Sequence, residues 1–127
     1  MSNSDTEMSK KEMLFRLLKK EAQYYNAILD LVKEEAFKLG NESTCNEVLP
    51  LIKKREILFS CIQEIEKALT PLKNDWKKDS NSLDPFTTQV KQQLLENDLI
   101  LEQILKQDQE NQKSMKKYLQ NLKSTKN

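Results

Sequence analysis

The side chains that could do chemistry in this sequence are carboxylates and two thiols, because the chain contains no histidine. Histidine is the usual general base near neutral pH, and a carboxylate replaces it only in a cleft that shifts its pKa. The candidate carboxylates stand at ordinary helix-face spacings, several with a lysine three or four residues away: Glu21, Glu34, Glu35, Glu64 and Glu66. We therefore expect these acids to be solvated, and we expect no catalytic residues and no enzyme activity.

The two thiols, Cys45 and Cys61, do not form a recognisable site. On one helix they would lie roughly 24 Å apart, whereas a disulfide needs Cα atoms within about 7 Å. Two thiols without histidine make a poor zinc site, and a single glycine cannot build a phosphate-binding loop. The sequence therefore predicts no metal and no cofactor, with both cysteines as small apolar residues at helix interfaces.

The charge balance also argues against nucleic acid and membrane partners. The 127 residues carry 21 Lys+Arg and 20 Asp+Glu, a net charge of +1, and the lysine clusters are dispersed among acids. No stretch approaches the roughly 18 apolar residues of a membrane span, and the N-terminus lacks the order of a signal peptide. We expect a cytoplasmic protein without membrane insertion.

One glycine and three prolines, with abundant Leu, Lys, Glu and Gln, favour a few long helices over a sheet. The spacing of apolar residues predicts helices over 9–39, 44–78 and 84–123 in a single helical domain, 1–127. Capping boxes at Ser9–Glu12 and Thr44–Glu47 mark the first two helix starts, and Gly40 is expected as a left-handed C′ residue. The fold class is all-α, an antiparallel three-helix bundle of long amphipathic, coiled-coil-like helices.

Three features of the last two helices bear on their arrangement. Pro71 either kinks the second helix or caps a fresh segment, and the sequence leaves both open. The 79–82 stretch is the clearest loop, and Asp84-Pro85 fits an N-cap and first turn. No internal repeat is visible. Antiparallel pairing across the loop places Arg55 near Asp108 as a polar pair, unless both side chains extend to solvent.

The third helix changes character along its length. Residues 90–105 are strongly apolar, 106–113 contain no apolar residue, and the pattern then resumes weakly. Its four apolar residues follow the i, i+3, i+4, i+7 spacing of helix-to-groove binding: Met115, Tyr118, Leu119 and Leu122. Residues 106–127 are thus predicted either as an arm that orders on a partner or as a cap on the end of the core, over the turn between the first and second helices.

The run from Leu17 to Leu69 resembles flagellar export chaperones of the FlgN type. The similar features are a long first helix (LLKKEAQYYNAILDLVKEE), a short polar turn and a second helix with basic residues before aliphatics (LIKKREILFSCIQEIEKAL). The segment LEQILKQDQENQKSMKKYLQNL is similar as well, with Asn111 between an aliphatic stretch and a weakly amphipathic end. Pro71 and the 79–85 loop depart from the family pattern.

The resemblance implies a cytoplasmic chaperone of flagellar or type III secretion. Such a chaperone binds the helical termini of structural subunits and keeps them unassembled before export. In that family the C-terminal helix binds the substrate, which here corresponds to Met115, Tyr118, Leu119 and Leu122. The alternative function is a structural coiled-coil scaffold or adaptor that self-associates, because long heptad stripes must be covered. The sequence leaves open whether the chain is a monomer or a homodimer.

Overall fold

The computed structural model describes residues 3–78 and 85–125, with side chains from 10 to 124 within those ranges. It contains helix α1 (Asn3–Leu39), the short 3₁₀ helix η1 (Cys45–Glu47), α2 (Val48–Lys78) and α3 (Pro85–Thr125). The described residues include no strand, which confirms the predicted all-α class. The predicted loop at 79–82 and the N-cap at Asp84 lie outside the described residues.

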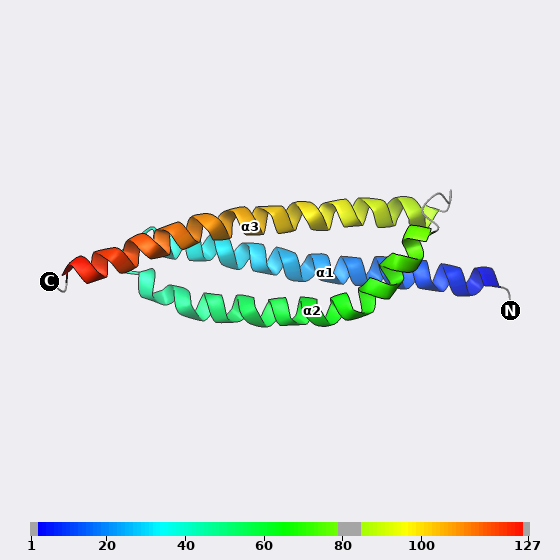
Figure 1. Cartoon of the computed structure of the whole chain (residues 1–127), viewed down its shortest axis with the longest axis horizontal. Helices are drawn as coiled ribbons and strands as arrows, with labels where there is room; N and C mark the ends of the chain where they lie inside the picture. Colours follow the sequence, from blue (N-terminus) through cyan, green and yellow to red (C-terminus); the bar gives the residue numbers. More distant parts are fainter. Residues whose placement is uncertain (1–2, 79–84, 126–127) are drawn as a thin grey trace.

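Helix α1 lies between α2 and α3 and packs against both along an elongated molecule (Figure 1). The chain reverses direction between α1 and α2 and again between α2 and α3, so α2 is antiparallel to its neighbours (Figure 1). Helices α1 and α3 consequently run parallel. This parallel pairing decides which residues of the first and last helices meet, and it shapes the candidate site.

Three local predictions about helix ends were wrong. Helix α1 begins at Asn3, so Ser9 lies inside it and not at its N-cap. Thr44 precedes η1 without capping it: its Oγ1 instead donates to the carbonyl of Lys38 at 2.8 Å. Gly40 does not have a positive φ, and its N–H donates to the Ala36 carbonyl at 3.1 Å, which continues the helical pattern. The turn after α1 is instead closed by side-chain bonds to backbone carbonyls.

Pro71 lies inside α2, which settles the choice that the sequence left open. Proline has no N–H to donate to the carbonyl four residues earlier, and its ring crowds that carbonyl, so helices bend at this residue. The last part of α2 bends and crosses α1 toward the start of α3 (Figure 1). There Leu72 and Trp76 pack onto a cluster that contains Leu14 and Val90.

Two apolar clusters form the core. One gathers around the middle of the molecule, and its buried members come from all three helices: Tyr25, Ile28, Leu29, Val32, Ile62 and Ile104. The other lies nearer the bend of α2: Leu14, Leu18, Ile65, Leu69 and Val90. Burial of this apolar surface supplies the main driving force for folding.

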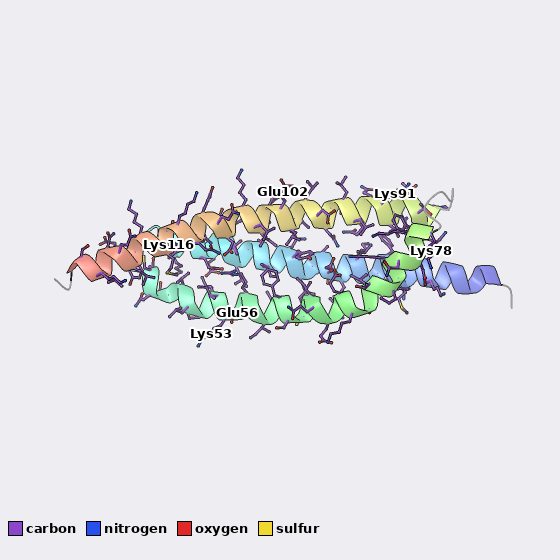
Figure 2. The ribbon with its side chains drawn as sticks, in the orientation of Figure 1. Lys53, Glu56, Lys78, Lys91, Glu102 and Lys116 are labelled. Atoms are coloured by element: carbon purple, nitrogen blue, oxygen red, sulfur yellow. The ribbon has the colours of Figure 1, made fainter. Side chains whose placement is uncertain are left out.

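Charged side chains cover the outer sides of the helices. The labelled side chains Lys53 on α2 and Lys91 and Glu102 on α3 project away from α1 (Figure 2). Both signs of charge occur along the outside, consistent with the dispersed pattern in the sequence. None of the described helices is long and apolar enough to cross a membrane.

Candidate functional site

The contact between α1 and α3 is a stack of alternating apolar and polar layers. At intervals of seven residues α1 presents Leu14, Glu21, Ile28 and Glu35, and α3 presents Val90, Asn97, Ile104 and Asn111. All eight side chains are buried. Buried asparagines in a parallel helix pair fix register, because any slip leaves their amides without partners.

Asn97 organises the first polar layer, which we call the Asn97 layer (Glu21, Glu66, Gln93 and Asn97). Its Nδ2 donates to the Leu18 carbonyl at 2.9 Å and to Glu21 Oε1 at 3.2 Å. Its Oδ1 accepts from Gln93 Nε2 at 2.9 Å. From α2, Glu66 faces the same layer and pairs with Lys73 at 3.4 Å.

Asn111 repeats this arrangement two heptads later, in what we call the Asn111 layer (Glu35, Arg55, Gln107, Asp108 and Asn111). Its Nδ2 donates to the Val32 carbonyl at 2.8 Å, and its Oδ1 accepts from Gln107 Nε2 at 3.0 Å. Both asparagines therefore contact the α1 carbonyl 79 positions earlier. The offset is constant because α1 and α3 run parallel and in register over this length.

Arg55 closes the Asn111 layer from α2. Its Nε and Nη2 donate to the two carboxylate oxygens of Glu35, each at 3.0 Å, and its Nη1 lies 3.2 Å from Asp108 Oδ1. The structure thus brings Arg55 and Asp108 together, as the antiparallel register of α2 and α3 predicts. The structure also gives Arg55 a second partner, Glu35, which the sequence did not indicate. The planar guanidinium makes its bidentate contact with this carboxylate.

The two buried glutamates differ in how their charge is balanced. Burial raises the pKa of Glu35, while the adjacent Arg55 lowers it and so opposes that change. Among the described residues, the groups that act on Glu21 are Glu66, Lys73 and Asn97, and no arginine is one of them. Burial, a hydrogen bond with Glu66 that requires a proton on Glu21, and repulsion from the Glu66 charge raise the pKa of Glu21 to about 8. The pKa of Glu66 is lowered, first by its hydrogen bond with Glu21 and then by the positive charge of Lys73. Near neutral pH a proton therefore neutralises Glu21 in the Asn97 layer, whereas Arg55 neutralises Glu35 in the Asn111 layer.

The expectation that all five candidate carboxylates are solvated was wrong for Glu21 and Glu35, which are buried. It holds for Glu64, which pairs with Lys67 at 2.9 Å on the exposed face of α2. Two short patterns nevertheless recur at a spacing of 14 residues. The sequence carries the pattern Gln-x-x-Glu-Asn twice, at 93–97 and 107–111, and Glu-Ala twice, at 21–22 and 35–36. These four short matches were the available signal.

The residues predicted to bind a partner lie where the end of α3 passes the turn after α1. Tyr118 and Leu122 line an open hollow of about 510 Å³, together with Leu39, Cys45 and Lys117. Tyr118 is half-buried and Leu122 is 42% exposed.

The other two predicted residues lie outside this hollow. Met115 is half-buried and lines a separate depression beside Arg55 and Asp108. Leu119, 49% exposed, lines neither cavity. The four predicted residues thus divide between a cap over the turn and an exposed apolar end.

Residues 106–125 continue α3 as one helix. Asn111 anchors the first part of this stretch to α1, so only the part beyond it resembles a free arm. Cys45 is buried, with its Sγ 3.5 Å from the Leu39 carbonyl, and Cys61 is half-buried; both are free thiols. Within the described chain, no three acidic or cysteine side chains gather so as to hold a metal ion.

Comparison with known proteins found no matching family model, no matching curated protein and no matching solved structure. The chemistry of the site must therefore be inferred from its own residues. The asparagines of the two polar layers are buried and hydrogen-bonded to α1, which suits a positioning role. The hollow at the end of α3 is open and lined by an aromatic ring, aliphatic groups and a lysine, features typical of surfaces that bind protein segments.

Proposed function

We propose that this chain is a protein-binding chaperone that works without catalysis in the cytoplasm. Its substrates are subunits of a flagellar or type III secretion system, bound through their helical termini. The proposal joins two lines of support, namely the resemblance of its helices to FlgN-type chaperones and the open hollow at the end of α3. The observation that carries it is that Tyr118 and Leu122 line this hollow while remaining partly exposed.

The hollow suits an apolar side chain presented by a helix. Leu39 and Cys45 line it from the α1 turn, Tyr118 and Leu122 from α3, and Lys117 and Glu42 add opposite charges. An aromatic anchor beside aliphatic walls and a charged rim is the usual composition of a binding hot spot. Leu119, which directly follows Tyr118, is 49% exposed and adds to the apolar surface available to a bound helix.

The test is binding of purified hook–filament junction proteins from the same genome, and of peptides from their terminal helices, measured by isothermal titration calorimetry. Truncation after Lys106 is unsuitable because it also removes Asp108 and Asn111 from the core. The double variant Tyr118→Ala/Leu122→Ala keeps that core intact. We expect it to weaken binding about tenfold or more, as the loss of two anchor residues does at other interfaces.

Leu95→Ala is the matched control, because Leu95 is a 60%-exposed leucine on the same helix that does not line the hollow. It should bind like the unmodified chain. Absence of binding by the unmodified chain to any of these subunits would refute the chaperone proposal. Unchanged affinity in the double variant would refute the assignment of the site to the end of α3.

A further inference from the structure

A second apolar depression lies on the α1–α2 pair, away from α3. It has a volume of about 450 Å³, and α3 contributes no residue to it. Its floor and walls are aliphatic side chains from two helices: Ala27, Leu31, Ile57 and Leu58. We call it the α1–α2 groove. Leu58 also packs against the central core cluster, but none of the groove residues belongs to the proposed chaperone site.

Large apolar side chains stand exposed along this groove. Ile57 on its α2 wall is 64% exposed. Phe37 continues the α1 row one turn beyond Glu34 and is 77% exposed, the highest value among the large apolar residues described. Isolated exposed apolar residues are common, but an apolar groove with an exposed isoleucine on its wall and an exposed phenylalanine one turn beyond it is typical of an interaction surface.

The two rims of the groove carry opposite charges. Asp30 and Glu34 line it from α1, and Lys54 lines it from α2. All three are exposed, and within the described part of the chain none of them forms an ion pair. Their charges are thus available to an occupant that places a basic group against Asp30 and Glu34 and an acidic group against Lys54.

A second copy of this chain carries its basic and acidic groups in that order. A two-fold axis running along the groove places α1 of one copy over α2 of the other, so that the acids of each face Lys54 of its partner. The same rotation covers Ile57 and Phe37 in both copies. A net charge of +1 adds little mutual repulsion. We propose that the α1–α2 groove is the interface of a symmetric homodimer, held by apolar contact and by paired Glu34 and Lys54 rims.

The oligomeric state tests this inference independently of the chaperone proposal. Sedimentation equilibrium over a concentration series should show the mass rising from 14.9 kDa to twice that value. Ile57→Asp should remain monomeric with an unchanged circular dichroism spectrum. Leu95→Asp adds the same charge to an exposed leucine outside the groove and should still dimerise. A monomer at every concentration, or a dimer that survives Ile57→Asp, would overturn the proposal.

Reversing the charges at positions 34 and 54 tests the two-fold arrangement of the dimer. Lys54→Glu leaves only acids on both rims of each copy, and Glu34→Lys adds a lysine to each copy, so each variant alone should dimerise about tenfold more weakly or worse. When the two variants are mixed, every position 34 of one chain meets an opposite charge at position 54 of the other. The mixture should recover the affinity of the unmodified chain. A mixture no tighter than either variant alone would rule out the two-fold arrangement.

Discussion

Among single residues, Arg55 has the largest predicted effect on stability, because it neutralises a carboxylate that water does not reach. The Glu35 side chain is only 2% exposed. Arg55→Leu leaves this charge buried without a partner, which typically costs about 3–5 kcal/mol. We expect urea unfolding, followed by circular dichroism, to show a loss of this size.

Two further variants separate charge burial from lost packing. Arg55→Leu combined with Glu35→Leu removes both charges and should recover most of the stability, because an apolar pair can replace a buried ion pair. Lys67→Leu breaks the exposed pair with Glu64 and should change stability by less than about 1 kcal/mol. If Arg55→Leu lowers the free energy of unfolding no more than Lys67→Leu does, Glu35 is solvated and the Asn111 layer is not a buried charge pair.

Glu21 makes stability depend on pH in the direction opposite to a usual acid. Its pKa is about 8 in the folded chain against 4.5 as the ordinary value, so between these the folded state binds more protons than the unfolded state. The contribution of Glu21 is therefore complete below about 4.5 and is lost as pH rises through 8. Glu66, whose pKa is lowered, acts with the opposite sign at lower pH.

Urea midpoints measured from pH 5 to pH 9 should consequently fall as the solution becomes more alkaline. Glu21→Gln keeps an acceptor for Asn97 and removes the ionisable proton, so it should flatten this dependence and be more stable than the unmodified chain at the alkaline end. Glu102→Gln, at an exposed position on α3 outside both proposed binding surfaces, is the control and should retain the slope. A slope that persists in Glu21→Gln would assign the titration to another group.

At the scale of elements, the backbone conformation at the end of α1 does not require a glycine. Gly40 lacks a positive φ, and a Cβ there would meet only the carbonyls of Ala36 and Phe37, both at an ordinary 3.5 Å. Gly40→Ala should stabilise the chain by about 0.4–1 kcal/mol, because alanine restricts the unfolded chain more than glycine does. A thermal melt gives the sign directly, and a loss of stability would mean that the helix ends in the left-handed conformation after all.

Helix α3 should exchange its amide hydrogens in two steps along its length. Asn111 fastens it to α1, whereas among the side chains described from 115 to 124 only Met115 and Tyr118 are half-buried and the rest are exposed. Hydrogen exchange should therefore be slow from 90 to about 113 and faster from 114 to 125, because exchange follows local opening. A bound substrate helix should slow the second range selectively. Uniform protection through 125 would instead indicate that the end of α3 is a permanent cap over the turn.

Helix existence could be predicted from apolar spacing, because long amphipathic periodicity is a strong and local signal. The pairing of Arg55 with Asp108 followed from one further assumption, that α2 and α3 are antiparallel. Glu35 was missed because its spacing to nearby lysines is that of an ordinary solvated acid, and because Arg55, its partner on α2, was paired with Asp108 alone. The C-cap at Gly40 was misjudged for a similar reason, since nearby side-chain bonds replaced the left-handed turn.

For the whole molecule, the alternating layers determine which of several possible helix arrangements forms. Apolar stripes alone would let α3 slide along α1 or pair antiparallel at similar energy, because hydrophobic contact has no direction. Asn97 and Asn111 exclude those arrangements, since each amide finds its acceptors only at one offset. Polar layers of this kind lower stability relative to an apolar seam and raise the uniqueness of the fold.

Replacing Gln93, Asn97, Gln107 and Asn111 together by leucine tests this division between stability and uniqueness. Donor and acceptor are removed in each Gln–Asn pair, while Glu21 loses its Asn97 donor, so the added apolar burial and this loss should leave the unfolding temperature similar. The fold should meanwhile become heterogeneous, with more than one amide signal per residue in a ¹H–¹⁵N spectrum and oligomers beyond the dimer. Four leucines placed instead at the exposed positions Gln92, Glu96, Gln103 and Glu110 control for added hydrophobicity. A single sharp set of signals from the layer variant would show that apolar packing alone selects the register, and that the asparagines serve another purpose.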